Sequence, residues 1–192
     1  MYKQITIEDL RGIKHLKIED FQQVNLFIGK NNCGKTTIIE ALFLLTGATN
    51  PHLPLKINTF RDINRIDENS WRLIFNKLDI NSNVKISGEL DKPKEKRNLI
   101  IKSKTTSYAI GIKDSYSGVP TVIDGLILEY SLIKGKNKKP KKITTEIVTE
   151  DAGIKIRPPK DYKEHLRGVF INAKTSSDII VFAGVNFLAE TA

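Results

Sequence analysis

The stretch Gly29–Thr36, with the sequence GKNNCGKT, constrains this chain more than any other because it matches the phosphate-binding loop pattern G-x-x-x-x-G-K-[ST] at every fixed position. A glycine at each end allows a tight turn in which backbone N–H groups face phosphate oxygens. Lys35 adds a positive charge on a flexible stem, and the Thr36 hydroxyl is a ligand type that suits a hydrated Mg²⁺ ion. The loop therefore predicts binding of a nucleoside triphosphate.

The residues on either side of the loop support this prediction. Val24–Ile28 is a mostly apolar run of strand length, which predicts a buried strand leading into the loop. After the loop, apolar residues recur at helical spacing from Ile38 to Leu45, and Gly47 predicts the end of the helix. The N-terminus of such a helix favours negative charge, so strand, loop and helix stand in the order that phosphate binding requires.

The composition is that of a soluble, globular chain of 192 residues, with 28% charged and 40% hydrophobic residues. No apolar run approaches the roughly 18 residues of a membrane span, and the first residues read as a strand rather than a signal peptide. We therefore expect a cytoplasmic protein without membrane contact. One cysteine and three scattered histidines predict neither an internal disulfide nor a zinc site, so Mg²⁺ carried by the nucleotide is the only metal implied.

The positive charge is concentrated in the second part of the chain. Residues 1–80 contain 11 Lys/Arg and 9 Asp/Glu, whereas residues 81–192 contain 20 and 13, so that the net charges are +2 and +7. The densest cluster is 134–142, with six lysines among nine residues. Such a cluster favours contact with DNA phosphates, but lysine-rich turns also occur for solubility alone, and both interpretations stay open.

The first 80 residues predict a small set of strands and helices. Alternating apolar residues indicate a strand over 2–9 and a second, antiparallel strand over 13–18. Two prolines indicate a loop over 48–54. Apolar residues at helical spacing over 57–80 predict one or two short helices with Trp71 as a core residue.

Beyond residue 80 the sequence changes to short β-rich runs, which predict antiparallel hairpins. These runs are 84–90, 98–102, 126–133, 143–148 and 154–157. Charged turn clusters at 91–97 and 134–142 separate some of them, and two further strand-like runs follow at 169–171 and 178–184.

Asn76–Asp79, with the sequence NKLD, matches the N-K-x-D pattern by which small GTPases recognise guanine. That pattern belongs after a buried strand, downstream of a D-x-x-G switch that itself follows the phosphate loop, whereas the D-x-x-G of this chain, at 9–12, precedes the loop. We interpret the match as coincidence.

The beginning of the chain resembles a known branch of ATPases. The segments IEDLRGI at 7–13, VNLFIGKNNCGKTT at 24–37 and EAL at 40–42 resemble the N-terminal start of the SMC/RecF-like branch of ABC-type ATPases. Within that branch the chain looks most like the AAA-family ATPases of the OLD type found in bacterial phage-defence systems. The resemblance covers about the first 60 residues.

The resemblance implies a set of nucleotide contacts. It assigns phosphate binding to the loop and the residue after it, namely Gly29, Lys30, Asn31, Asn32, Cys33, Gly34, Lys35, Thr36 and Thr37, with Thr36 as the Mg²⁺ ligand. Arg11 occupies the place of an arginine that reaches towards the nucleotide in this family, and an exposed turn arginine is the alternative. Cys33 stands where a smaller residue is usual, which suits either an inert filler or a redox-sensitive loop.

Several parts of a complete ABC-type ATPase have no counterpart in the sequence. There is no acidic pair at the end of an apolar strand, no glutamine after the loop and no LSGG-like signature. In the resembled family these parts lie far downstream. We therefore expect the chain to be an N-terminal lobe, truncated at its C-terminus, with a P-loop core section over 1–80 and a β-rich hairpin section over 81–192.

The expected fold class is α/β: a P-loop NTPase lobe with an antiparallel β-rich section and few helices. The leading hypothesis is the ATP-binding lobe of an OLD/SMC-like ATPase in a DNA-acting or phage-defence system, with self-association or pairing with a related subunit. The alternative is a non-hydrolysing nucleotide- or DNA-binding module that pairs with a full-length relative. A P-loop kinase fits less well because the region after residue 80 lacks alternating β–α units.

Overall fold

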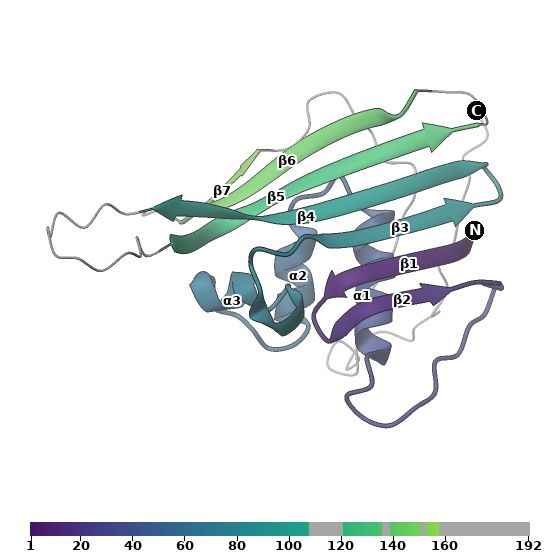
Figure 1. Ribbon diagram of the computed structural model, residues 1–192, viewed down its shortest axis with the longest axis horizontal. Coiled ribbons are helices and arrows are strands. Elements are labelled where there is room, and N and C mark those ends of the chain that lie inside the picture. The colour runs from purple at the N-terminus through teal and green to yellow at the C-terminus, as the bar shows by residue number, and fades with distance from the viewer. Residues whose placement is uncertain (108–120, 136–138, 151–152, 158–192) are drawn as a thin grey trace, which may run out of the picture.

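Seven strands form one antiparallel sheet in the order β2-β1-β3-β4-β5-β6-β7 (Figure 1). The computed structural model describes residues 1–107, 121–135, 139–150 and 153–157. The strands are β1 (Tyr2–Leu10), β2 (Ile13–Ile18), β3 (Val84–Leu90), β4 (Glu95–Ser107), β5 (Thr121–Lys134), β6 (Lys141–Glu150) and β7 (Gly153–Arg157). Because β1 and β2 lie in the same sheet as β3 to β7, the described parts of the sections 1–80 and 81–192 share one sheet.

The two faces of the sheet differ as strand alternation requires. A row of apolar side chains crosses the buried face, since Ile7 pairs with Ile86, Ile86 with Leu99 and Leu99 with Tyr130. All four are at most 2% exposed. The opposite face carries cross-strand ion pairs, such as that between Lys102 and Glu129 at 2.6 Å.

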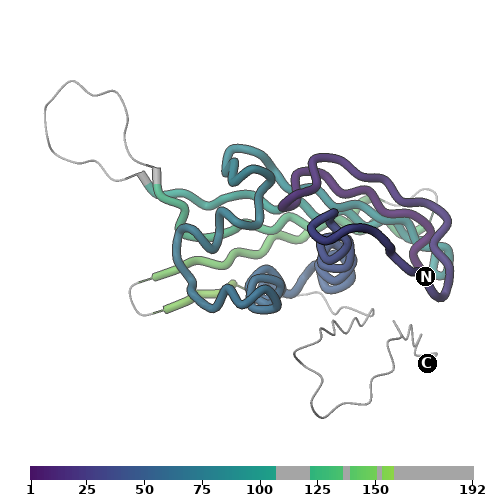
Figure 2. Tube along the Cα trace, turned by 90° about the horizontal axis from the view of Figure 1, so that it is seen from below, coloured from purple at the N-terminus to yellow at the C-terminus, as the bar shows by residue number. Residues whose placement is uncertain are grey.

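The helices lie together on the buried face of the sheet (Figures 1 and 2). They are α1 (Lys35–Thr46), α2 (Leu53–Thr59), α3 (Glu68–Arg72) and the 3₁₀ turn η1 (Asn76–Leu78). α1 packs on β1, β3 and β4. Trp71 of α3 is fully buried, and its indole N–H donates to the Thr149 hydroxyl of β6 at 3.1 Å.

Most predicted elements of the described residues are confirmed. The two N-terminal strands, the helix after the loop, the short helices and the five β-rich runs are all present, and Trp71 is a core residue. The loop predicted over 48–54 is too long, because α2 begins at Leu53 with Pro54 in its first turn, where a proline removes no helical hydrogen bond. The runs at 169–171 and 178–184 lie outside the described residues.

The predicted strand over Val24–Ile28 is wrong for this structure. These residues belong to no strand, and Val24, Leu26 and Ile28 are 87%, 80% and 83% exposed. A strand requires a neighbour for its backbone N–H and C=O groups, and no described strand lies beside this segment. Only Phe27 turns inward, where its ring packs edge-on against Phe21 with 6.4 Å between centroids.

The charged cluster at 91–97 is a solvated turn only in its first half. Glu95 and Arg97 begin β4 and point into the buried face, where their side chains are 1% and 0% exposed and pair at 3.1 Å. The Arg97 guanidinium also donates to the Thr46 carbonyl at the end of α1, at 3.4 Å. Two charges bury together here because each satisfies the other.

We predict that Glu95→Gln lowers the free energy of unfolding by about 3–5 kcal/mol, because it removes a carboxylate that pairs with the buried Arg97 guanidinium. Urea unfolding measures this loss. Lys134→Ala is the matched control, since Lys134 pairs with Glu95 at 3.2 Å from a side chain that is 54% exposed. The control should cost no more than about 1 kcal/mol. Equal losses in the two variants would contradict a structural role for the buried pair.

Candidate phosphate-binding site

The loop before α1 has the backbone shape that its glycines predicted. Gly34 is the N-cap of α1 and has φ of 93°, a left-handed conformation that residues with side chains seldom adopt. A Cβ atom on Gly29 would lie 2.8 Å from the Cys33 sulfur, so only glycine fits there without a shift. Asn32, with φ of 63°, adopts the left-handed region that asparagine tolerates. These conformations fold the loop over the N-terminus of α1.

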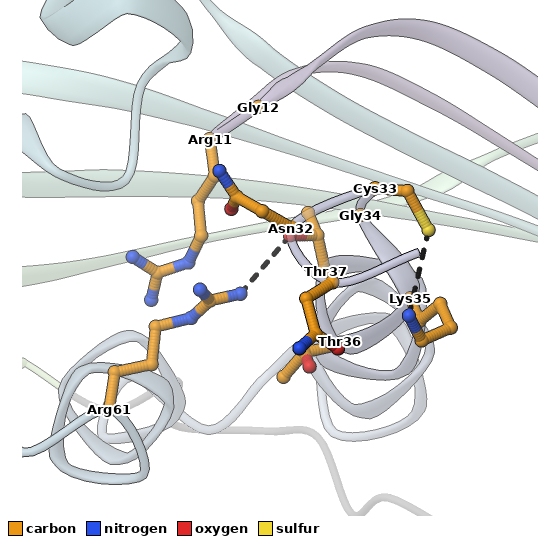
Figure 3. A pocket seen from close by; sticks show the side chains of 10 residues that line it. Arg11, Gly12, Asn32, Cys33, Gly34, Lys35, Thr36, Thr37 and Arg61 are labelled. Atoms are coloured by element: carbon orange, nitrogen blue, oxygen red, sulfur yellow. Dashed lines mark hydrogen bonds between the residues drawn. The ribbon is translucent and has the colours of Figure 1, made fainter. Parts of the chain in front are cut away.

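Lys35 bridges the loop from within (Figure 3). Its ammonium donates to the carbonyls of Gly29 and Lys30 at 2.8 and 2.7 Å and lies 3.6 Å from the Cys33 sulfur. A phosphate that enters the loop would exchange one acceptor for another, which costs little because the ammonium remains paired.

A pocket of about 490 Å³ opens beside the loop. It is lined by Arg11, Gly12, Asn31, Asn32, Cys33, Gly34, Lys35, Thr36, Thr37 and Arg61. The structure thus brings eight of the ten predicted contact residues together at one pocket, while Gly29 and Lys30 support it from the loop. Thr36 is exposed and Thr37 is buried. No carboxylate is among these lining residues.

Glu40, behind the pocket, is a fully buried carboxylate that two arginines share. Arg11 Nε donates to its Oε2 at 2.9 Å, and Arg61 donates from Nε to Oε1 at 2.6 Å and from Nη2 to Oε2 at 3.0 Å. The Arg61 contact is a two-point fork, the geometry in which a guanidinium holds a carboxylate most firmly. Both carboxylate oxygens are therefore satisfied by charged donors.

Arg11 lines the pocket but is bound mainly to protein acceptors. Besides Glu40, its guanidinium donates to the carbonyls of Leu73 and Ile57 and to the Asn58 side chain at 2.8–3.2 Å. Its side chain is 8% exposed. Burial lowers the pKa of Arg11 below its usual value, and the Glu40 carboxylate opposes that shift. The structure therefore does not show an exposed turn arginine, while the contact with nucleotide stays a prediction.

Arg61 is a pocket residue that no sequence pattern predicted. Its side chain is 34% exposed, and Nη2 donates to the Thr37 hydroxyl at 3.1 Å on the pocket wall (Figure 3). A signal was available in Glu40, which shares the buried stripe of α1 with Thr37, Ala41 and Leu44. An acidic residue on the apolar face of a helix requires a buried cationic partner.

The NKLD match has a structural explanation. The Asn76 side chain donates to the Arg11 carbonyl at 2.6 Å, and the Asp79 carboxylate accepts from the backbone N–H of Asn81. Arg11 has φ of 49°, an uncommon conformation for a residue with a side chain, and its own N–H donates to the Ile74 carbonyl. Asn76 therefore supports the turn that carries Arg11, as expected if the guanine-recognition match is coincidental.

The residues that the structure describes lack two further kinds of feature. None of their helices combines the length and apolar character needed to cross a membrane. In the same residues, no group of three or more His, Cys, Asp or Glu side chains is arranged to hold a metal ion.

Relatives with curated descriptions match limited parts of the chain. An uncharacterized protein of Methanocaldococcus jannaschii is 46% identical over 48 residues, 25% of this chain and 22% of that protein. An ATP/GTP phosphatase of Helicobacter pylori is 28% identical over 93 residues, 47% of this chain and 25% of that protein. The DNA replication and repair protein RecF of Lactobacillus acidophilus is 42% identical over 41 residues, 21% of this chain and 11% of RecF. The matched parts thus span a quarter or less of these relatives.

The family comparison covers far more of the chain. The model of the AAA ATPase domain matches residues 1–182, which include the phosphate loop, both arginines that share Glu40 and all seven strands. The P-loop NTPase lobe expected from the loop and the hairpins agrees with this match. The chain belongs to the AAA ATPase domain family.

Proposed function

We propose that this chain is the ATP-binding lobe of an ATPase and holds Mg–ATP at residues 29–37. The observation that carries the proposal is the loop itself, which lies over the N-terminus of α1 with Gly34 in the left-handed region and the Lys35 ammonium inside it. Backbone amides, a helix N-terminus and a lysine together form an anion site. The name of the Helicobacter relative, an ATP/GTP phosphatase, agrees with a nucleotide as the anion.

The residues present fit both ATP and Mg²⁺. A phosphate can approach the loop backbone closely because Gly29 has no side chain, and the exposed Thr36 at the start of α1 offers a hydroxyl oxygen, which is a ligand that Mg²⁺ accepts. Bound Mg²⁺ would neutralise part of the phosphate charge. Thr37, one residue further, would contact the α-phosphate.

Hydrolysis, in this proposal, depends on acidic groups that the described residues do not place at the pocket. The pocket lining contains cations, amides and hydroxyls but no carboxylate to orient an attacking water. The chain would then bind ATP and associate with itself or a related ATPase subunit, while turnover needs acidic residues from elsewhere.

The wider role that we propose is in a DNA-acting or phage-defence system. It rests on the resemblance of the first 60 residues to OLD-type ATPases and on the match to RecF, whose name gives DNA replication and repair. The net charge of +7 over residues 81–192 favours contact with DNA phosphates.

Lys35→Ala should weaken ATP binding about 100-fold or more, because it removes the charge inside the loop. Calorimetric titration with Mg–ATP measures the affinity. Lys56→Ala is the matched control: it removes the same charge from an exposed lysine of α2 that does not line the pocket. The control should bind within about threefold of wild type. Equal losses would indicate a general charge effect instead of a specific phosphate site.

The wild-type chain alone should hydrolyse ATP far more slowly than the roughly 1 s⁻¹ at the lower end of ordinary enzymes. Phosphate release measures turnover, and light scattering after gel filtration with and without ATP measures association. Dimers that form with ATP but without turnover would favour the non-hydrolysing alternative. Turnover typical of a complete ATPase would refute the dependence on outside groups.

Replacing Lys139 and Lys142 by Gln should weaken binding to a short DNA duplex, and should lower the slope of log affinity against log salt by about 2, if both lysines contact phosphates. Fluorescence anisotropy at several salt concentrations measures both values. Lys14→Gln with Lys17→Gln is the control, since it removes two exposed lysines from β2. If the two double variants behave alike, the lysine cluster at 134–142 does not contact DNA specifically.

A further inference from the structure

We propose that Glu40 is a positioning residue: its buried carboxylate fixes the Arg61 guanidinium at the pocket wall beside Thr37, where Arg61 adds a second cation for the phosphates. The inference rests on the proposed ATP binding and deepens it, because it assigns roles to two residues of that site.

The geometry around Glu40 makes this carboxylate a rigid anchor. It is 0% exposed, and both of its oxygens accept hydrogen bonds from guanidinium groups at 2.6–3.0 Å. A carboxylate held in this way on the first turns of α1 cannot turn to water, so its orientation is set by the helix. The fork contact transfers that orientation to Arg61, because a guanidinium is planar and binds through two parallel N–H groups.

Of the two arginines that bind Glu40, Arg61 is the one whose guanidinium can also donate to a ligand. The Arg11 guanidinium donates hydrogen bonds to Glu40, to the carbonyls of Leu73 and Ile57 and to Asn58. The Arg11 side chain is 8% exposed. Arg61 donates to Glu40 and to the Thr37 hydroxyl, and its side chain is 34% exposed. No contact is found for its Nη1 among the described residues. Figure 3 shows its guanidinium at the pocket, across from Lys35.

The contact between Arg61 and Thr37 indicates which part of the nucleotide Arg61 meets. Thr37 lies in the first turn of α1, one residue beyond the Mg²⁺ ligand Thr36, and its hydroxyl accepts from Arg61 at 3.1 Å. An anionic oxygen is a better acceptor than a neutral hydroxyl. A phosphate that enters beside Thr37 therefore competes for the same guanidinium without releasing it from Glu40.

A positioning role for Glu40 and a purely electrostatic role predict opposite changes in ATP affinity when its charge is removed. Removing a negative charge close to a phosphate site should strengthen binding of an anionic nucleotide if Glu40 acted only through its charge. If Glu40 orients Arg61, its removal should weaken binding, because the guanidinium loses its fixed direction. The two outcomes differ in direction and do not depend on a small difference in magnitude.

The experiment measures Mg–ATP affinity by calorimetric titration for the wild type and four variants, with thermal unfolding recorded in parallel. Arg61→Gln should weaken binding about tenfold. Arg61→Lys should weaken binding almost as much, so that its ATP affinity lies within about threefold of that of Arg61→Gln. An ammonium keeps the charge but cannot form the fork with Glu40. Arg65→Gln removes the same charge from an exposed residue nearby and should leave the affinity within about twofold of wild type. Glu40→Gln should weaken binding about tenfold.

A double variant tests whether the two residues act as one unit. Glu40→Gln combined with Arg61→Gln should bind no more weakly than Arg61→Gln alone, because the effect of Glu40 passes through Arg61. A merely structural Glu40 would lower the unfolding temperature and add its own loss of affinity to that of Arg61.

Each result decides between these roles. Wild-type affinity in Arg61→Lys, tighter binding in Glu40→Gln, equal effects of Arg61→Gln and Arg65→Gln, or additive losses in the double variant would overturn the proposal. If Glu40→Gln does not fold, the comparison of the Lys and Gln variants at position 61 with Arg65→Gln decides alone. Failure of the wild type to bind ATP would overturn the proposed function itself, and it would be seen before any variant is compared.

Discussion

The buried carboxylate of Glu40 is the interaction on which the helical side of this structure depends. Burial of a lone carboxylate costs several kcal/mol or more, and here the cost is offset by two guanidinium groups that come from distant parts of the chain. Arg11 comes from the turn between β1 and β2, and Arg61 follows α2. Because Arg11 also binds the carbonyls of Ile57 and Leu73, one carboxylate joins the sheet, α1, α2 and α3. Arg11 and Arg61 also line the pocket, so the packing of the helices and the shape of the site cannot vary independently.

A second buried charge lies at the other end of α1. The helix begins at the phosphate loop and ends at Thr46, whose carbonyl accepts from Arg97. A cation near a helix C-terminus matches the direction of the helix dipole, as would a phosphate bound at the N-terminus. Arg97 is in turn neutralised by Glu95, which meets Lys134 at the surface. The apolar row of Ile7, Ile86 and Leu99 belongs to the hydrophobic core on which α1 packs, while the two ionic clusters lie at different points along the helix.

Local patterns were sufficient where a residue's environment follows from its neighbours in sequence. Alternation over 84–90 matches β3 residue for residue, and the two glycines of the loop occupy the positions that only glycine fits. The pattern failed where distant residues decide the outcome. Glu95 and Arg97 look like part of a charged turn until β4 places them in the core, and Arg61 has no local signature because its role depends on Glu40, 21 residues earlier. Cross-sheet and cross-helix partners cannot be derived from spacing alone.

In the segment before the loop, too, the local pattern alone does not decide the structure. Val24, Leu26 and Ile28 have the composition of a buried strand, yet among the described residues 22–33 have no backbone–backbone hydrogen bond, and those three side chains are at least 80% exposed. Phe27 against Phe21, and the hydrogen bond from the Phe21 N–H to the Lys3 carbonyl, tie this segment to β1. On the other side, the loop continues directly into α1, which packs on three strands and holds Glu40. The position of the phosphate loop in this structure is therefore determined mainly from the helix side. This explains why the buried ion pairs that Glu40 of α1 makes with Arg11 and Arg61 can bear on a phosphate loop that precedes Glu40 in the chain.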